Sequence, residues 1–110
     1  MMPWLVRHGE VLCTLEVPAG IAGRARGLLG RDGIDGAILL RPTRSVHTLG
    51  MRFSIDVAFC DKGFIVLDTV CMAPNRVGRP RLRARSVIEA EAGAFERWRL
   101  VPGDQLEIEE

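Results

Sequence analysis

The feature that most constrains the fold is a strict alternation of apolar and other residues between positions 52 and 59. The apolar members of the pattern are Phe53, Ile55, Val57 and Phe59, and the residues between them are Arg52, Ser54, Asp56 and Ala58. A period of two sends the two sets to opposite faces of a β-strand. A turn sequence at residues 61–63 and a long apolar run over residues 64–72 follow. Together they predict a β-hairpin whose second strand is covered on both faces.

The remaining chain is divided into short segments by glycine and proline, which is typical of β-rich domains. Strands are predicted over residues 11–17, 36–40, 87–89 and 105–109, and short helices over residues 21–29 and 92–99. A chain of 110 residues that is 47% hydrophobic is long enough for one small core. We therefore expect residues 1–110 to form a mainly β fold, a single compact β-sandwich or barrel-like domain with two short helices.

The overall charge gives no electrostatic argument for binding to nucleic acid or membranes. The chain carries 15 basic and 14 acidic residues, a net charge of +1, so nucleic acid and membrane surfaces are disfavoured as partners. No segment approaches the roughly 18 apolar residues of a spanning helix, and charged residues interrupt the first ten positions, where a signal peptide is apolar. These features predict a cytoplasmic protein that does not bind membranes.

The three cysteines, Cys13, Cys60 and Cys71, are odd in number, far apart and without a CxxC pair. This spacing matches neither a disulfide framework nor a zinc site. Because each cysteine has apolar neighbours, we expect buried, reduced thiols.

Four blocks along the chain suggest a family. They are residues 26–31 (RGLLGR), residues 45–59 (SVHTLGMRFSIDVAF), residues 87–89 (VIE) with Gly93, and residues 102–104 (PGD). In order and spacing, residues 11–110 resemble the DUF192 (UPF0127) family. That resemblance implies a compact, mainly β domain of bacteria and archaea without an established biochemical function. The chain departs from the common pattern at residues 47–51, where many members have a Trp-Met-Lys-Asn-Thr segment, and at Ser54, where most have proline.

A polar cluster, His47, Thr48, Arg52 and Asp56, offers the first candidate site. If the polar face of a strand over residues 52–60 lines a cavity, Arg52 can bind a carboxylate or phosphate through paired hydrogen bonds. The predicted function is then a binding module for a small polar or anionic ligand of unknown identity.

Two alternatives use the same residues. His47 or Asp56 could act as the base of a hydrolytic enzyme, although no nucleophile motif accompanies them. The cluster could instead be structural, with Arg52 and Asp56 forming an ion pair on a half-exposed strand. The sequence leaves open whether the protein is an enzyme.

A second candidate is an arginine stripe that would bind an acidic macromolecular partner. Alternate residues of an extended segment point to the same side. If residues 79–85 are extended, one side therefore carries the guanidinium groups of Arg79, Arg81, Arg83 and Arg85. No aromatic residue interleaves with them for base stacking, and acidic residues at the C-terminal end (Glu107, Glu109 and Glu110) could neutralise them. The alternative interpretation is a charged edge strand that resists aggregation.

Neither a metal nor a cofactor is expected. The two histidines, His8 and His47, do not have the spacing of metal ligands. Asp56, Asp61 and Asp68 could form a hard-cation site, but Asp61 belongs to a predicted turn, where aspartate is common without any metal.

Overall fold

The computed structural model of the protein describes residues 2–20 and 27–110. This part of the chain contains seven strands and one helix. In chain order they are β1 (Trp4–Arg7), β2 (Glu10–Glu16), β3 (Ala37–Leu40), β4 (Ile55–Cys60), β5 (Val66–Met72), β6 (Ser86–Glu91), α2 (Ala94–Trp98) and β7 (Leu106–Glu109).

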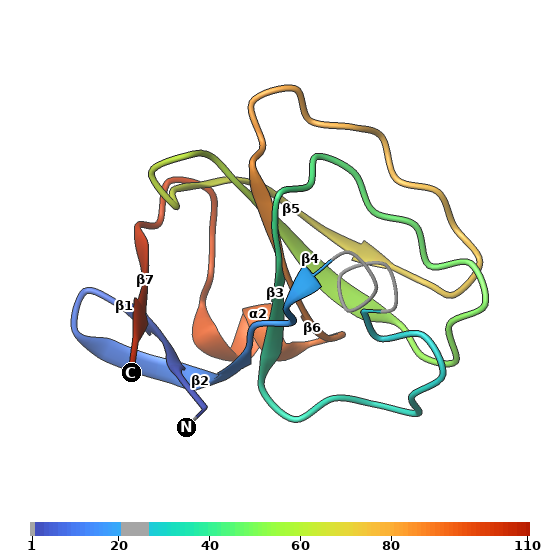
Figure 1. Ribbon diagram of the computed structural model, residues 1–110, viewed down its shortest axis with the longest axis horizontal. Coiled ribbons are helices and arrows are strands. Elements are labelled where there is room, and N and C mark those ends of the chain that lie inside the picture. The colour runs from blue at the N-terminus through green and yellow to red at the C-terminus, as the bar shows by residue number, and fades with distance from the viewer. Residues whose placement is uncertain (1, 21–26) are drawn as a thin grey trace.

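The strands form one curled sheet in the order β5-β4-β6-β3-β2-β1-β7 (Figure 1). Strands β2 and β3 run parallel, and every other neighbouring pair is antiparallel. The two ends of the sheet also approach each other. The amide of Val66 donates to the carbonyl of Asp104 at 2.9 Å, and the amide of Leu106 donates to the carbonyl of Phe64 at 2.9 Å. The mainly β, barrel-like class predicted from the sequence is therefore confirmed.

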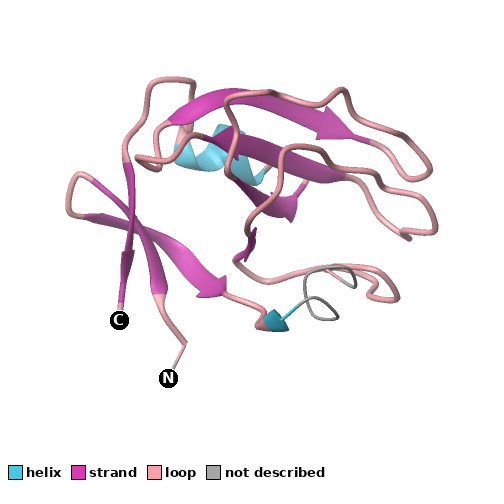
Figure 2. Cartoon of the chain, turned by 45° about the horizontal axis from the view of Figure 1, so that its top comes forward, coloured by secondary structure: helices cyan, strands magenta, loops and turns pink. Residues whose placement is uncertain are grey.

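Both faces of the central strands are covered. On one face lies α2 (Figure 2). It contributes Ala94 and Phe95 to a core shared with residues of all seven strands, among them Leu5, Leu39 and Ile88. On the other face, loop residues such as Leu28 and Met51 cover a second core, whose strand members include Ile38, Val57 and Phe59. Small side chains on the first face, such as Ala58 and Ala90, leave room for the helix.

The hairpin prediction needs one correction. The turn at residues 61–63 is present, and the Asp61 carboxylate accepts hydrogen bonds from the amides of Gly63 and Ile65. However, the first strand, not the second, is buried on both faces, because β4 lies between β5 and β6 while β5 is at the end of the sheet. Strand β4 also begins at Ile55, three residues later than the alternation predicts.

The helix predictions differ in outcome. The helix predicted over residues 92–99 is confirmed as α2. The helix predicted over residues 21–29 lies mostly outside the described residues, since the structure describes only residues 27–29 of it, and these belong to a turn. Strand β1 was not predicted. No helix in the described ranges has both the length and the apolar character needed to cross a membrane.

Two long loops, residues 43–48 and 75–85, lie side by side along one end of the molecule (Figures 1 and 2). Backbone hydrogen bonds join the loops along their length. At one end the amide of Thr43 donates to the carbonyl of Arg85 (3.0 Å), and at the other the amide of Thr48 donates to the carbonyl of Arg76 (2.8 Å). Gly78 permits this approach, because a Cβ atom there would lie 2.8 Å from the carbonyl oxygen of Val46. We call this pair of loops the arginine lobe.

Candidate functional site

Asp56 is buried in the structure and holds a turn. Only 7% of the residue is exposed, and Oδ2 accepts hydrogen bonds from the amides of Gly93 (3.0 Å) and Phe95 (3.1 Å). These amides lie just before and inside α2. A carboxylate there satisfies donors that the start of a helix leaves without partners. Asp56 therefore ties the β6–α2 connection to the centre of the sheet.

Thr48 has a similar structural position at the base of the arginine lobe. Its side chain is fully buried. Its Oγ1 donates a hydrogen bond to the carbonyl of Ala73 (2.6 Å) and accepts one from the amide of Arg76 (2.9 Å). One hydroxyl thus joins the two loops where they leave the core.

Replacing Thr48 with valine is expected to lower the free energy of unfolding by about 2 kcal/mol, because an isosteric apolar group leaves both backbone partners without hydrogen bonds. Urea unfolding measures the change. Thr48→Ser keeps the hydroxyl and is expected to lose less than half as much. Equal stability of the valine variant and the wild type would show that the hydroxyl does not hold the lobe.

His47 and Arg52 are exposed. The Nδ1 atom of His47 accepts a hydrogen bond from the amide of Leu49 (3.3 Å). Arg52 lies in the loop before β4 and forms a surface ion pair with Asp32, with Nη1 and Oδ1 3.2 Å apart. Such an exposed pair contributes little to stability.

The residues of the predicted polar cluster therefore each have different hydrogen-bond or ion-pair partners. Residues 52–60 do not form one strand with a polar face, because β4 begins at Ile55 and all six of its residues are buried. Asp56 faces the helix, whereas Arg52 and His47 face solvent.

The predicted arginine stripe is also rearranged. The segment is not an extended strand: a turn at Leu82 and Arg83 breaks the alternation, with the amide of Ala84 donating to the carbonyl of Arg81 at 3.0 Å. Arg81 points inward. It pairs with Asp68 at 2.8 Å and stacks 4.2 Å above the centre of the Phe59 ring. The Arg81 guanidinium lowers the pKa of the Asp68 carboxyl. Arg81 is thus an anchor for the lobe.

The other arginines of the lobe face solvent. Within the described residues, none of them has an ion-pair partner; they are Arg44, Arg76, Arg79, Arg83 and Arg85. Two apolar side chains lie among them, Val77 with 76% and Leu82 with 81% of the residue exposed. The lobe therefore presents charged and apolar groups together.

The cysteines only partly match the expectation of buried thiols. Cys60 is buried, Cys13 is partly buried and Cys71 is exposed, because β5 lies at the end of the sheet. Burial raises the pKa of the Cys13 and Cys60 thiols to about 12. Burial, with Asp56 nearby, also raises the pKa of Cys71. All three thiols are held in the protonated, weakly nucleophilic form at neutral pH.

Glu89 is an unusual buried acid. It lies at the centre of β6, between Ile38 of β3 and Val57 of β4, and only 4% of it is exposed. Strand alternation places its side chain on the face of Val87, in the second core. Burial raises the pKa of its carboxyl from 4.5 to about 7. Residues 86–91 read Ser-Val-Ile-Glu-Ala-Glu. The sequence sign of this buried acid was Glu89, a glutamate with apolar neighbours on both sides within a predicted strand.

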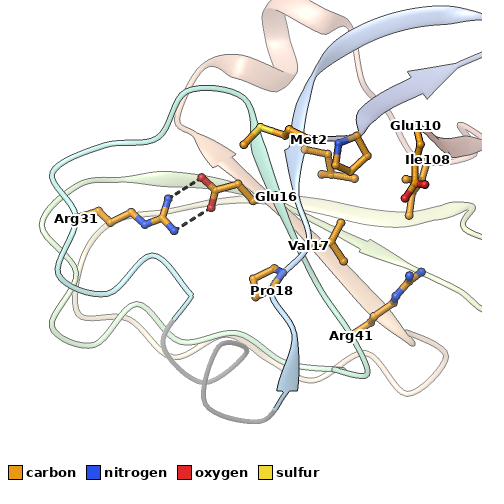
Figure 3. Close-up of a pocket in the computed structure, with 10 residues that line it drawn as sticks. Met2, Glu16, Val17, Pro18, Arg31, Arg41, Ile108 and Glu110 are labelled. Atoms are coloured by element: carbon orange, nitrogen blue, oxygen red, sulfur yellow. Dashed lines mark hydrogen bonds and ion pairs between the residues drawn. The ribbon is translucent and has the colours of Figure 1, made fainter.

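A pocket of about 710 Å³ lies where β2 diverges from β3, near both ends of the described chain (Figure 3). Its apolar lining includes Met2, Leu15, Val17, Pro18 and Ile108. The charged residues that line it are Glu16, Arg31, Arg41 and Glu110. Sequence reasoning did not find this pocket, because its walls come from segments about a hundred residues apart.

Comparisons with known protein sequences agree on one family. DUF192, described as "Uncharacterized ACR", matches residues 4–108. The UPF0127 protein PH1112 of Pyrococcus horikoshii is 35% identical over 88 residues, which are 76% of each chain. The UPF0127 protein PYRAB11210 of Pyrococcus abyssi is 31% identical over 98 residues, 84% of each chain. A protein of unknown function from Novosphingobium aromaticivorans superposes with a TM-score of 0.77 over 97% of this chain and 84% of its own, at 16% identity.

Proposed function

The chain belongs to the DUF192 family, whose function is unknown, and we propose that this member uses its arginine lobe to bind an acidic polypeptide segment. One observation carries the proposal. Two hydrogen-bonded loops hold six of the chain's 15 basic residues and none of its 14 acidic residues, with exposed apolar side chains among the guanidinium groups. The net charge of +1 conceals this concentration of positive charge.

The electrostatics support an anionic partner. Five guanidinium groups at one end of this small protein give a local positive potential that attracts acidic segments and speeds their association. Arginine also binds carboxylates through two parallel hydrogen bonds, which gives direction as well as attraction. The anchoring of Arg81 on Asp68 and Phe59 keeps the loops in place. The binding surface is therefore ordered before a partner arrives.

The apolar residues favour a polypeptide over a nucleic acid. Leu82 and Val77 are the two most exposed large hydrophobic residues described, and both lie on the lobe. A partner with apolar side chains between its acidic residues would cover Leu82 and Val77 and remove them from water. The lobe contains no phenylalanine, tyrosine or tryptophan on which a nucleic-acid base could stack.

The two readings built on the polar cluster receive less support. A ligand site on residues 52–60 would use Asp56, which already accepts two backbone hydrogen bonds. A hydrolytic site would pair His47 with Asp56, but each of these side chains is hydrogen-bonded to backbone amides of its own surroundings.

Binding of a fluorescent peptide of alternating glutamate and leucine is expected to depend on the lobe. Raising the salt concentration from about 50 to about 200 mM is expected to weaken binding at least tenfold, because ion pairs are screened. The double variant Arg79→Gln, Arg83→Gln is expected to weaken it about tenfold. Leu82→Ser is expected to weaken it several-fold without changing the affinity for polyglutamate. Fluorescence anisotropy measures all three changes.

The matched control is the double variant Arg97→Gln, Arg99→Gln, which removes the same charge from exposed arginines outside the lobe. It is expected to bind like the wild type. Equal weakening by both double variants would mean that only net charge matters, which contradicts a specific lobe. Tighter binding to a DNA duplex than to the peptide would overturn the choice of partner.

A further inference from the structure

We infer that the pocket between β2 and the chain ends binds a small amphipathic carboxylate, with its apolar body on the pocket floor and its headgroup at Arg41. The volume of about 710 Å³ lies within the usual range of small-molecule sites, roughly 300–1,000 Å³. The site is separate from the arginine lobe.

The pocket arises from the way β2 ends. Strands β2 and β3 pair at only two positions, Leu15 with Ala37 and Glu16 with Ile38. Val17 and Pro18 then leave the sheet, and proline cannot supply a further ladder hydrogen bond. Figure 3 shows Val17 between Met2 and Arg41, with Pro18 to one side of it. The space opened by this divergence is the pocket.

One charged wall of the pocket is already neutralised. Arg31 donates two hydrogen bonds to the Glu16 carboxylate, at 3.0 and 2.8 Å, as the dashed lines in Figure 3 show. This bidentate pair raises the pKa of Arg31. Because each partner satisfies the other, the pair gives shape to the pocket and does not attract a charged ligand.

Arg41 differs from Arg31. Among the described residues it has neither an ion-pair partner nor a side-chain hydrogen bond. Its guanidinium group lies on the side of the pocket where Ile108 and Glu110 are drawn (Figure 3). A carboxylate beside Arg41 would gain a charge-assisted hydrogen bond. The apolar part of the same molecule would cover Met2 and Val17, which are half-exposed.

Glu110 would distinguish two classes of such a ligand, fatty acids and apolar amino acids. A fatty-acid carboxylate has one negative group, which Glu110 repels. An apolar amino acid adds an ammonium group, which Glu110 attracts. Both carry the shared chemistry of a carboxylate on an apolar body, so both are used as probes.

Titration of the isotope-labelled protein with octanoate and with leucine tests the inference by NMR. Shifts of the backbone amides of Val17, Arg41 and Ile108 are expected with at least one probe. Arg41→Gln is expected to weaken that binding about tenfold or more. Octanol, which lacks the carboxylate, is expected to bind more weakly than octanoate. The control Arg83→Gln, on the lobe, is expected to leave the titration unchanged.

The remaining outcomes identify or reject the ligand class. Glu110→Gln is expected to strengthen octanoate binding if the ligand is of the fatty-acid kind, and to weaken leucine binding if it is an amino acid. Absence of shifts at the pocket with both probes overturns the inference. Unchanged affinity in Arg41→Gln overturns it as well. Neither result bears on peptide binding by the lobe, so the two proposals fail independently.

Discussion

Replacing Asp56 with alanine is expected to lower the free energy of unfolding by about 3 kcal/mol, because two backbone amides lose a charged hydrogen-bond acceptor. The amide of Phe95 is buried and that of Gly93 is partly buried, so water replaces the carboxylate poorly. Asp56→Asn keeps a side-chain oxygen without the charge and is expected to lose about half as much. Urea unfolding followed by circular dichroism measures both variants.

The control for this prediction is Asp32→Ala. Asp32 carries a carboxylate like Asp56, but it forms a surface ion pair with Arg52 and 87% of its side chain is exposed. Its loss is expected to change the free energy of unfolding by less than about 0.5 kcal/mol. If Asp56→Ala were as stable as the wild type, the carboxylate would not be needed to hold the turn. Asp56 would then again be a candidate ligand-binding residue.

Replacing Glu89 with glutamine is expected to stabilise the protein at about pH 8 by up to about 3 kcal/mol, since a shift of one pKa unit corresponds to about 1.4 kcal/mol. The folded-state pKa of about 7 is above the ordinary value of 4.5. Below pH 4.5 the carboxyl is neutral in both the folded and unfolded states, and the fold bears no charge penalty. Between pH 4.5 and about 7 the unfolded chain releases this proton while the folded protein keeps it, so wild-type stability falls, and above pH 7 the loss is complete.

The expected signature of Glu89→Gln is therefore a pH-dependent difference. Thermal unfolding should show a melting temperature roughly ten degrees above that of the wild type at about pH 8, and no difference at about pH 4. Glu91→Gln is the matched control, because Glu91 lies two residues along the same strand but is exposed. A stability difference that is the same at both pH values would contradict a raised pKa for Glu89.

The local elements of the fold were largely predictable. Apolar alternation and turn chemistry act over a few residues, so the segments that became β2, β3, β4, β5, β6, β7 and α2 could be identified from the sequence. Strand β1 was missed because residues 4–7 are too short to show a pattern. The blocks of residues that resemble DUF192 also identified the family correctly.

The candidate sites were much less predictable. The polar cluster was inferred from the spacing of residues 47–56, but the structure gives Thr48 and Asp56 backbone partners that lie 25–39 residues away. The alternating arginines suggested one extended face, but a turn and the pull of Asp68 on Arg81 changed which side chains reach solvent. Spacing in the sequence cannot report such partners.

The sequence by itself determined which segments become strands, where the hairpin turns, and that the chain is a mainly β member of its family, because each of these depends on neighbouring residues. The tertiary structure decided which strand lies at the centre of the sheet, which charged residues are buried, and where the lobe and the pocket form. Those features depend on residues far apart in the chain, such as Asp56 and Phe95, which are hydrogen-bonded, and Met2 and Ile108, which line the same pocket. Burial and hydrogen bonding at these contacts set what each side chain can do.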